Sequence, residues 1–226
     1  MAAAPGEFLV SAQQVAHSWL REMTLSGAML PGQPLRQEEV ARQLGISRLP
    51  IREALNRLAT EGLVELKPRR GFYVASLNEE EIDDIFDMRA MLEGRAGYLA
   101  AQCTTPADAD AVDCLVAKLD AAVDSGVPFE HYAQLNVRFH ERLYQTCHRK
   151  HLQRQIAMLR DAVAPHIRLL ASETGELQRA QHEHRLLAKH YRLGNAELVA
   201  ELCREHCAYT ARALIRKIRS EPTTVV

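Results

Sequence analysis

Three histidines and one asparagine have the spacing of a metal site in the second half of the chain. Asn136 and His140 are four residues apart, so a helix places them on one face together with Tyr144. His184 and His206 each lie among apolar residues of two further predicted helices. Neutral imidazoles that converge from rigid elements bind divalent metals and leave coordination positions open. Each histidine alone is more simply a core residue hydrogen-bonded to a neighbour, but three inward-facing histidines favour a metal.

A second group of residues indicates nucleic-acid binding. After Ser47 a helix is predicted in which Arg48, Arg52 and Asn56, each four residues apart, share the solvent-facing side. Arginine binds the O6 and N7 atoms of guanine bidentately in the major groove, and a positively charged turn suits phosphates or the minor groove. That turn is Lys67-Pro68-Arg69-Arg70-Gly71. A solvated helix face and an ordinary charged turn would explain each feature separately. Their order along the chain favours DNA binding.

We predict that the elements carrying these arginines form a winged helix-turn-helix. Ser11 and Gln14 predict a capping box that opens a bracing helix, with Ala12, Val15, Ala16, Trp19 and Met23 on its buried side. A second helix ends at Gly45, and Ser47 is the predicted N-cap of the helix that begins at Arg48. Short strands are predicted at residues 63–66 and 72–74 around the basic turn.

The remainder of the chain predicts an all-helical bundle that positions the histidines. The six expected helices cover about residues 79–102, 105–124, 128–147, 150–171, 175–193 and 196–219, with a kink at Pro165. The fold class is therefore mainly α. We expect a DNA-binding domain at 1–75, a helical domain for effector binding and dimerisation at 76–220, and disordered residues at 1–6 and 221–226.

Composition and charge restrict the function. The chain has 226 residues, 47% hydrophobic and 25% charged, with a net charge of −1. Residues 1–75 contain nine Lys/Arg and seven Asp/Glu, so the basic excess lies at the front. This small excess argues against a general nucleic-acid coat and for a homodimer with a local DNA footprint. Without a long apolar run, and with five cysteines that form no CxxC pair, we expect a cytoplasmic, nucleoid-associated protein rather than a membrane or disulfide-stabilised one.

The run SRLPIREALNRLATEGLVELKPRRGFYVA resembles the DNA-binding domain of the GntR family of bacterial transcription regulators. The family's usual form has Ser-Arg-Thr-Pro, then Arg-Glu-Ala-Leu, a Gly-Leu and an Arg-Gly. The resemblance implies that DNA is contacted by Ser47, Arg48, Arg52, Arg69, Arg70 and Gly71. Leu49 departs from the pattern where threonine is common. An apolar contact with a thymine methyl group there would alter the preferred operator.

The helical half resembles the FCD effector domain, in its six-helix, VanR-like form rather than the seven-helix FadR form. That resemblance implies zinc, nickel or manganese, zinc first, above a cavity for small carboxylates. His140, His184 and His206 match the family's ligand pattern, whereas Asn136 replaces an aspartate, which weakens the ligand but leaves the ion's positive charge undiminished. The stretch MRAMLEGRAGYLAA makes Arg89 a predicted effector contact, with Tyr144 as a second. Alternatively, Arg89 pairs with Glu93 at the rim of the bundle.

These observations predict a ligand-responsive transcription regulator, not an enzyme, most often a repressor in this family. Two protomers would bind a palindromic operator in double-stranded DNA, and a small organic acid would act through the metal. One alternative is a metal-dependent hydrolase or hydratase, which needs a general base. Glu183 and Glu141 are the nearest candidates, and both are expected to point away from the site. The other is a regulator with a purely structural metal and no effector.

Overall fold

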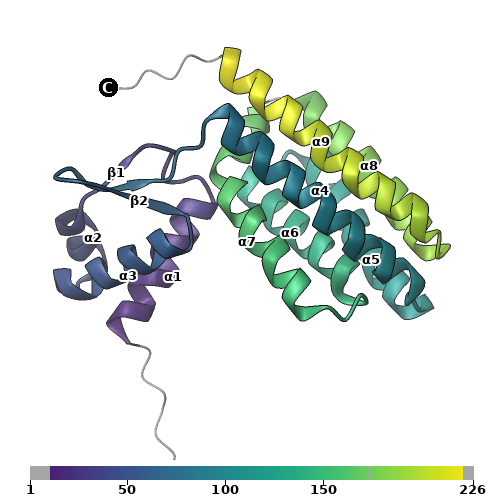
Figure 1. Ribbon diagram of the computed structural model, residues 1–226, viewed down its shortest axis with the longest axis horizontal. Coiled ribbons are helices and arrows are strands. Elements are labelled where there is room, and N and C mark those ends of the chain that lie inside the picture. The colour runs from purple at the N-terminus through teal and green to yellow at the C-terminus, as the bar shows by residue number, and fades with distance from the viewer. Residues whose placement is uncertain (1–10, 173, 221–226) are drawn as a thin grey trace, which may run out of the picture. The chain divides into compact units, whose positions relative to one another are not determined.

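The structure is a computed structural model that describes residues 11–172 and 174–220 (Figure 1). The chain divides into two compact units, Met1–Ser76 and Leu77–Val226. The terminal segments expected to be disordered, residues 1–6 and 221–226, lie outside the described residues. Within the described ranges, every helix is either too short or too polar to cross a membrane.

The first unit consists of three helices and a small antiparallel sheet. The helices are α1 (Ala12–Leu25), α2 (Gln37–Leu44) and α3 (Arg48–Thr60), and the strands are β1 (Pro34–Leu35), β2 (Val64–Lys67) and β3 (Gly71–Val74). The strand order is β1-β3-β2, so β3 is central. Strand β1 was not predicted, because two residues are too few to show alternation. Its pairing with Tyr73 and Phe72 exists only in the folded unit.

The predicted buried side of α1 is partly wrong. The capping box of Ser11 and Gln14 is present. The buried residues of α1, however, are Ala16, His17, Leu20 and Thr24, whereas Ala12 and Val15 are exposed. His17 is buried because its Nε2 atom has a polar partner, Glu61 Oε1, at 2.8 Å. Glu61 lies just after α3, far from His17 in the sequence, so the sequence alone does not show this burial. The contact joins residues 44 positions apart in the chain, so no local pattern predicts it.

The turn between α2 and α3 follows the prediction in its backbone. Gly45 ends α2 with a φ of 66°, in the left-handed region that glycine adopts without a steric penalty. Ser47 has the extended conformation of an N-cap, but its side chain makes no capping hydrogen bond within the described part of the chain, which corrects the prediction. The Ser47 side chain is exposed instead, so its hydroxyl is available to other partners.

The second unit is all-helical, as predicted. It contains α4 (Glu79–Gln102), α5 (Pro106–Ser125), α6 (Phe129–Gln145), α7 (Lys150–Ile167), a short 3-10 helix η1 (Arg168–Ser172), α8 (Thr174–Arg192) and α9 (Ala196–Ser220). The helix predicted to reach residue 171 therefore ends at Ile167. Pro165 removes a backbone donor near its last turn, and the chain continues in the tighter 3-10 form.

Helices α4 and α9 lie side by side along their length (Figure 1). Glycine permits this close approach: a Cβ atom at Gly97 would lie 2.9 Å from Cys203 Sγ and 3.1 Å from Val199 Cγ1. Cys203 and Cys207 are buried in this part of the bundle, as expected for small apolar side chains. Helices α4 and α9 together form one wall of the bundle, and α9 carries His206.

Candidate metal centre and DNA-binding surface

The three predicted histidines meet in the interior of the second unit. His140 comes from α6, His184 from α8 and His206 from α9, and all three are buried. One ring nitrogen from each lies within 4.8 Å of the other two. The ring centroids are 5.1 to 5.3 Å apart, so the three rings are in direct contact with one another. The tertiary structure therefore produces the convergence that the helical spacing predicted.

In each of the three rings, the Nδ1 atom is the nitrogen that has a hydrogen-bond partner. His184 Nδ1 lies 2.8 Å from Gln181 Oε1, and Gln181 Nε2 donates to Asp120 Oδ1 at 2.9 Å, which fixes the amide with its oxygen toward the imidazole. His206 Nδ1 lies 2.6 Å from Glu183 Oε2. These acceptors place the proton on Nδ1 and leave the Nε2 lone pair available.

The third ring follows the same pattern through a weaker contact. His140 Nδ1 is 3.5 Å from the Tyr144 hydroxyl, which donates its own proton to Glu93 Oε2 at 2.8 Å. The tyrosine oxygen is thus the acceptor for an Nδ1 proton. His140 and His184 therefore each have a buried Nε2 with its lone pair unused, and the contact of His206 Nδ1 with Glu183 favours the same tautomer in the third ring.

Unpaired buried atoms support a metal-binding role for this cluster. His140 Nε2, His184 Nε2 and Asn136 Oδ1 are buried and have no hydrogen-bond partner among the described residues. A buried acceptor without a partner costs about 1–3 kcal/mol, so several in one place call for an explanation. Asn136 lies one helical turn before His140 on α6. Two imidazole nitrogens and an amide oxygen, completed by His206, are suitable ligands for a divalent transition metal.

The environment keeps the imidazoles of His140 and His184 neutral, as metal binding requires. Burial, and the repulsion that a second protonated imidazole at His184 or His206 would cause, lower the pKa of His140 well below its ordinary value. Burial and His206 do the same to the pKa of His184. Neutral imidazole is the form whose lone pair binds a metal, so protons compete weakly at these two ligands near neutral pH.

Glu183 corrects a prediction, since it was expected to point away from the site. Its side chain reaches from α8 to His206 on α9, and Arg179 pairs with the same carboxylate. Burial is the largest single influence and raises the pKa of Glu183, but the hydrogen bonds and charges of His206 and Arg179 together outweigh it, so the net pKa is lowered. Sequence reasoning also missed Gln181, although its position three residues before His184 would have indicated a contact on the same helix face.

The predicted effector contacts, Arg89 and Tyr144, are both bound to one carboxylate. Arg89 Nε donates to Glu93 Oε1 at 2.8 Å, and the Tyr144 hydroxyl donates to Glu93 Oε2. The i,i+4 pair that was the alternative for Arg89 is thus present, but it is buried rather than at the rim. Burial opposes the charge on Arg89, yet Glu93 raises its pKa overall, so the pair stays ionised.

The predicted DNA-binding residues lie on the surface of the first unit. Ser47, Arg48, Arg52 and Asn56 are exposed at the start and along one side of α3, and the side chain of Arg48 is held by Glu38 of α2 at 2.9 Å. Leu49 is 66% exposed, a large apolar side chain that contributes little to the core. This side of α3 therefore carries groups that suit the edges of bases.

The turn of the β2–β3 hairpin supplies the remaining predicted contacts. Arg69 and Arg70 are exposed there, and Arg69 adopts a φ of 62° although it is not glycine. Gly71 has a φ of 94°, which a side chain would strain. The arginines at this turn are thus presented by a compact wing, consistent with phosphate or minor-groove contact.

Comparison with known proteins agrees with both units. The model of the bacterial regulatory proteins of the gntR family matches residues 11–74, and that of the FCD domain matches residues 84–209. The HTH-type transcriptional regulator YdhC of Bacillus subtilis (strain 168) is 28% identical over 184 residues, covering 80% of this chain and 81% of YdhC. The HTH-type transcriptional regulator McbR of Escherichia coli (strain K12) is 30% identical over 191 residues, covering 83% of each.

A solved structure shows the same architecture. The structure of E. coli McbR/YncC superposes with a TM-score of 0.81 at 26% sequence identity, covering 92% of this chain and 99% of that chain. These relatives are regulators, so the hydrolase alternative is not supported even though Glu183 lies closer to the histidines than expected. The FCD model alone matches more than half of the residues. The chain therefore belongs to the GntR family, as a DNA-binding transcription regulator with a C-terminal FCD domain.

Proposed function

We propose that this regulator senses a small organic acid through a metal ion held by His140, His184, His206 and Asn136. The observation that carries the proposal is the set of unpaired buried acceptors in the cluster. A bound divalent ion, zinc first and nickel or manganese next, supplies positive charge and open coordination positions for carboxylate oxygens. The asparagine in place of an aspartate leaves that charge uncompensated by a fourth ligand, which favours an anionic effector.

Arg89 and Tyr144 form the polar wall of the proposed effector site. Both donate to Glu93, which fixes their positions beside His140. The N–H groups of Arg89 that Glu93 does not engage would orient an acid whose carboxylate approaches the metal. Tyr144, whose one proton goes to Glu93, would contribute through its position beside His140. A group held rigidly before binding loses little conformational entropy when the effector arrives.

At the DNA, we propose that two protomers of a homodimer place their α3 helices in successive major grooves of a palindromic operator. Ser47, Arg48, Leu49, Arg52 and Asn56 would contact bases and nearby phosphates. Arg69, Arg70 and Gly71 of the hairpin turn would contact the backbone or the minor groove. The protein would act in the cytoplasm on the nucleoid, as a repressor that the effector releases. Effector binding changes DNA affinity only by its difference in affinity for the two arrangements of the dimer.

The decisive experiment combines operator selection with an effector screen. Selection from a random duplex library identifies the operator, and size-exclusion chromatography with light scattering gives the stoichiometry of the complex. Operator affinity is then measured against mono-, di- and hydroxycarboxylates and sugar acids, with zinc-loaded and chelator-treated protein. We expect one acid class to weaken DNA binding only with metal present. If every acid leaves DNA binding unchanged while the chelator lowers the melting temperature, the metal is structural and the sensing proposal fails.

A further inference from the structure

An ion pair joins the two helices of the helix-turn-helix on the surface of the first unit. Helices α2 and α3 lie side by side there (Figure 1). Arg48, the first residue of α3, donates from Nη1 to Oε1 of Glu38, in the first turn of α2, at 2.9 Å. The two side chains are 69% and 68% exposed. The pair therefore lies in solvent, at the end of α3 where the predicted DNA-binding surface begins.

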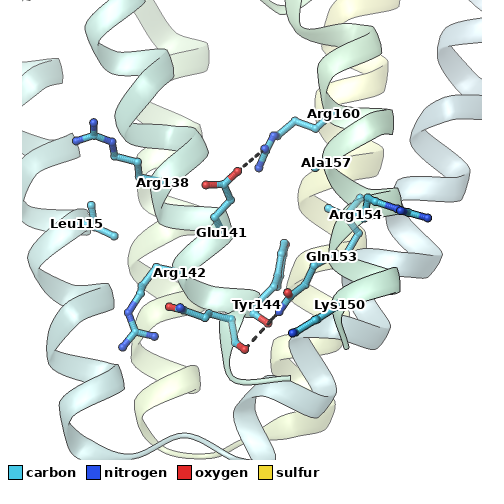
Figure 2. Close-up of a pocket in the computed structure, with 12 residues that line it drawn as sticks. Leu115, Arg138, Glu141, Arg142, Tyr144, Lys150, Gln153, Arg154, Ala157 and Arg160 are labelled. Atoms are coloured by element: carbon cyan, nitrogen blue, oxygen red, sulfur yellow. Dashed lines mark hydrogen bonds and ion pairs between the residues drawn. The ribbon is translucent and has the colours of Figure 1, made fainter. Parts of the chain in front are cut away.

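Packing does not hold the Arg48 side chain, so Glu38 is the group that directs it. Arg160 of the second unit is a contrasting case, because its side chain is only 12% exposed where it pairs with Glu141 at a groove lined by α6 and α7 (Figure 2). An exposed arginine samples many rotamers and loses this freedom when it binds. A partner that already holds the side chain reduces that loss.

Glu38 places a negative charge where the protein is expected to face a polyanion. The other arginines predicted to contact DNA, Arg52, Arg69 and Arg70, have no carboxylate partner among the described residues. Their charges are free to attract phosphates, whereas a carboxylate on this surface repels phosphates in any DNA sequence. A role in specificity accounts for such a group beside Arg48, since specificity is a difference between affinities and does not require the highest affinity.

The contact with Glu38 leaves one edge of the Arg48 guanidinium open. Guanine presents O6 and N7 as a pair of acceptors, which two adjacent donors of one arginine bind together. Glu38 accepts from Nη1, and the Nε and Nη2 atoms of Arg48 have no partner in the part of the chain that the structure describes. These two N–H groups point in parallel and form a fork. Glu38 therefore fixes the guanidinium without occupying the fork that a guanine needs.

We propose that Glu38 positions Arg48 for one guanine of the operator, and so increases discrimination between DNA sequences while lowering overall affinity. The inference rests on the proposed placement of α3 in the major groove. Glu38 acts through Arg48 and needs no base contact of its own. Its charge weakens binding to every duplex, whereas the fork that it directs strengthens binding only where a guanine is present.

Fluorescence anisotropy of the full-length protein tests this assignment. The duplexes are the operator selected with the wild type, a scrambled sequence of equal length, and operators in which each G·C pair in turn becomes A·T. Arg48→Lys keeps the charge but removes the fork, so it identifies the base pair that Arg48 reads. Replacing that pair should weaken wild-type binding about tenfold, and Glu38→Gln binding about threefold or less. Glu38→Gln should also bind the scrambled duplex about twofold more tightly.

Glu39→Gln is the matched control. Glu39 follows Glu38 on α2, is exposed, and pairs with Arg36 rather than with a residue of α3. Its substitution removes the same charge, so the scrambled duplex should again bind about twofold more tightly, with wild-type discrimination at the pair that Arg48 reads. In the double variant Glu38→Gln/Arg48→Lys, discrimination should equal that of Arg48→Lys alone, because Glu38 acts through Arg48.

Four results would overturn the inference: wild-type discrimination in Glu38→Gln, an equal loss in Glu39→Gln, additive losses in the double variant, or an equal weakening of all duplexes by Glu38→Gln. The last result would indicate a role in folding only, which circular dichroism and thermal melting also report. Failure of the proposed placement of α3 has a separate signature, namely wild-type discrimination at every base pair in Arg48→Lys. A loss in Arg48→Lys without a loss in Glu38→Gln rejects only the role of Glu38.

Discussion

Replacing Glu183 with glutamine should weaken metal binding without unfolding the domain. The Glu183 carboxylate contacts His206 Nδ1 at 2.6 Å, and the His206 side chain is 9% exposed. Glutamine retains an acceptor for the Nδ1 proton but removes the negative charge that makes the imidazole a better donor to a metal. Loss of such an outer hydrogen-bond partner typically costs 10- to 100-fold in metal affinity. We expect Glu183→Gln near the lower limit, about tenfold or about 1.4 kcal/mol.

Alanine at the same position should have the larger effect, about a hundredfold. It leaves the buried Nδ1 proton of His206 unpaired and allows the ring to adopt the other tautomer, which turns the wrong nitrogen into an acceptor. Asn136→Asp should act in the opposite direction, because a carboxylate is a stronger ligand for zinc than a neutral amide.

The assay is zinc competition with a chromogenic chelator on metal-depleted protein, with circular dichroism to verify helicity. Glu205→Gln is the matched control, since Glu205 is exposed on α9 next to His206 and its loss removes the same charge. The reasoning is refuted if Glu183→Gln binds zinc within twofold of the wild type, or if Glu205→Gln loses as much affinity. Either result would mean that the contact with His206 has no part in metal binding.

Gly97→Ala should lower the free energy of unfolding by about 1–3 kcal/mol in urea denaturation, because the added methyl group would lie 2.9 Å from a buried sulfur atom. Gly175→Ala, which has open space, should not be destabilising. Burial lowers the pKa of His166 from 6.5 to about 4, so the unfolded chain binds the extra proton between these values and stability falls as the pH drops. Between pH 6.5 and about 4, the free energy of unfolding of metal-depleted His166→Gln should therefore fall by about 3 kcal/mol less than that of the metal-depleted wild type. An equal pH dependence of the two proteins would refute the assignment. Arg52→Ala should weaken binding to the selected operator by about 1–3 kcal/mol, measured by fluorescence anisotropy, whereas Arg57→Ala should change it little.

Local patterns predicted much of the fold because they depend on neighbours in the chain. The limits of α4 at Glu79 and Gln102 follow from the Asn78 capping box and from helical periodicity, both of which are readable in sequence. The buried face of α1 was predicted less well. His17 is buried there in contact with Glu61, which lies 44 residues further along the chain, and no local pattern reports that contact.

For the candidate metal centre, too, the sequence predicted some features and not others. The residue types and spacing indicated His140, His184 and His206, since inward-facing imidazoles stand out on apolar helix faces. Their hydrogen-bond partners were not evident. Gln181 is an ordinary polar residue in the sequence, and Glu183 was assigned to the wrong direction. A long side chain on one helix reaches a neighbouring helix only at a particular packing angle and register, which spacing does not encode.

The sequence by itself determined the family, the order of the helices, the arginines on the exposed side of α3 and the histidines available for a metal. These properties depend on residue type and on the fixed geometry of the helix. The tertiary structure decided which hydrogen-bond partner each histidine has and that Arg89 is neutralised by a buried carboxylate. Those outcomes depend on how α4, α6, α7, α8 and α9 pack together, because hydrogen bonding and burial are properties of side chains brought together from distant parts of the chain.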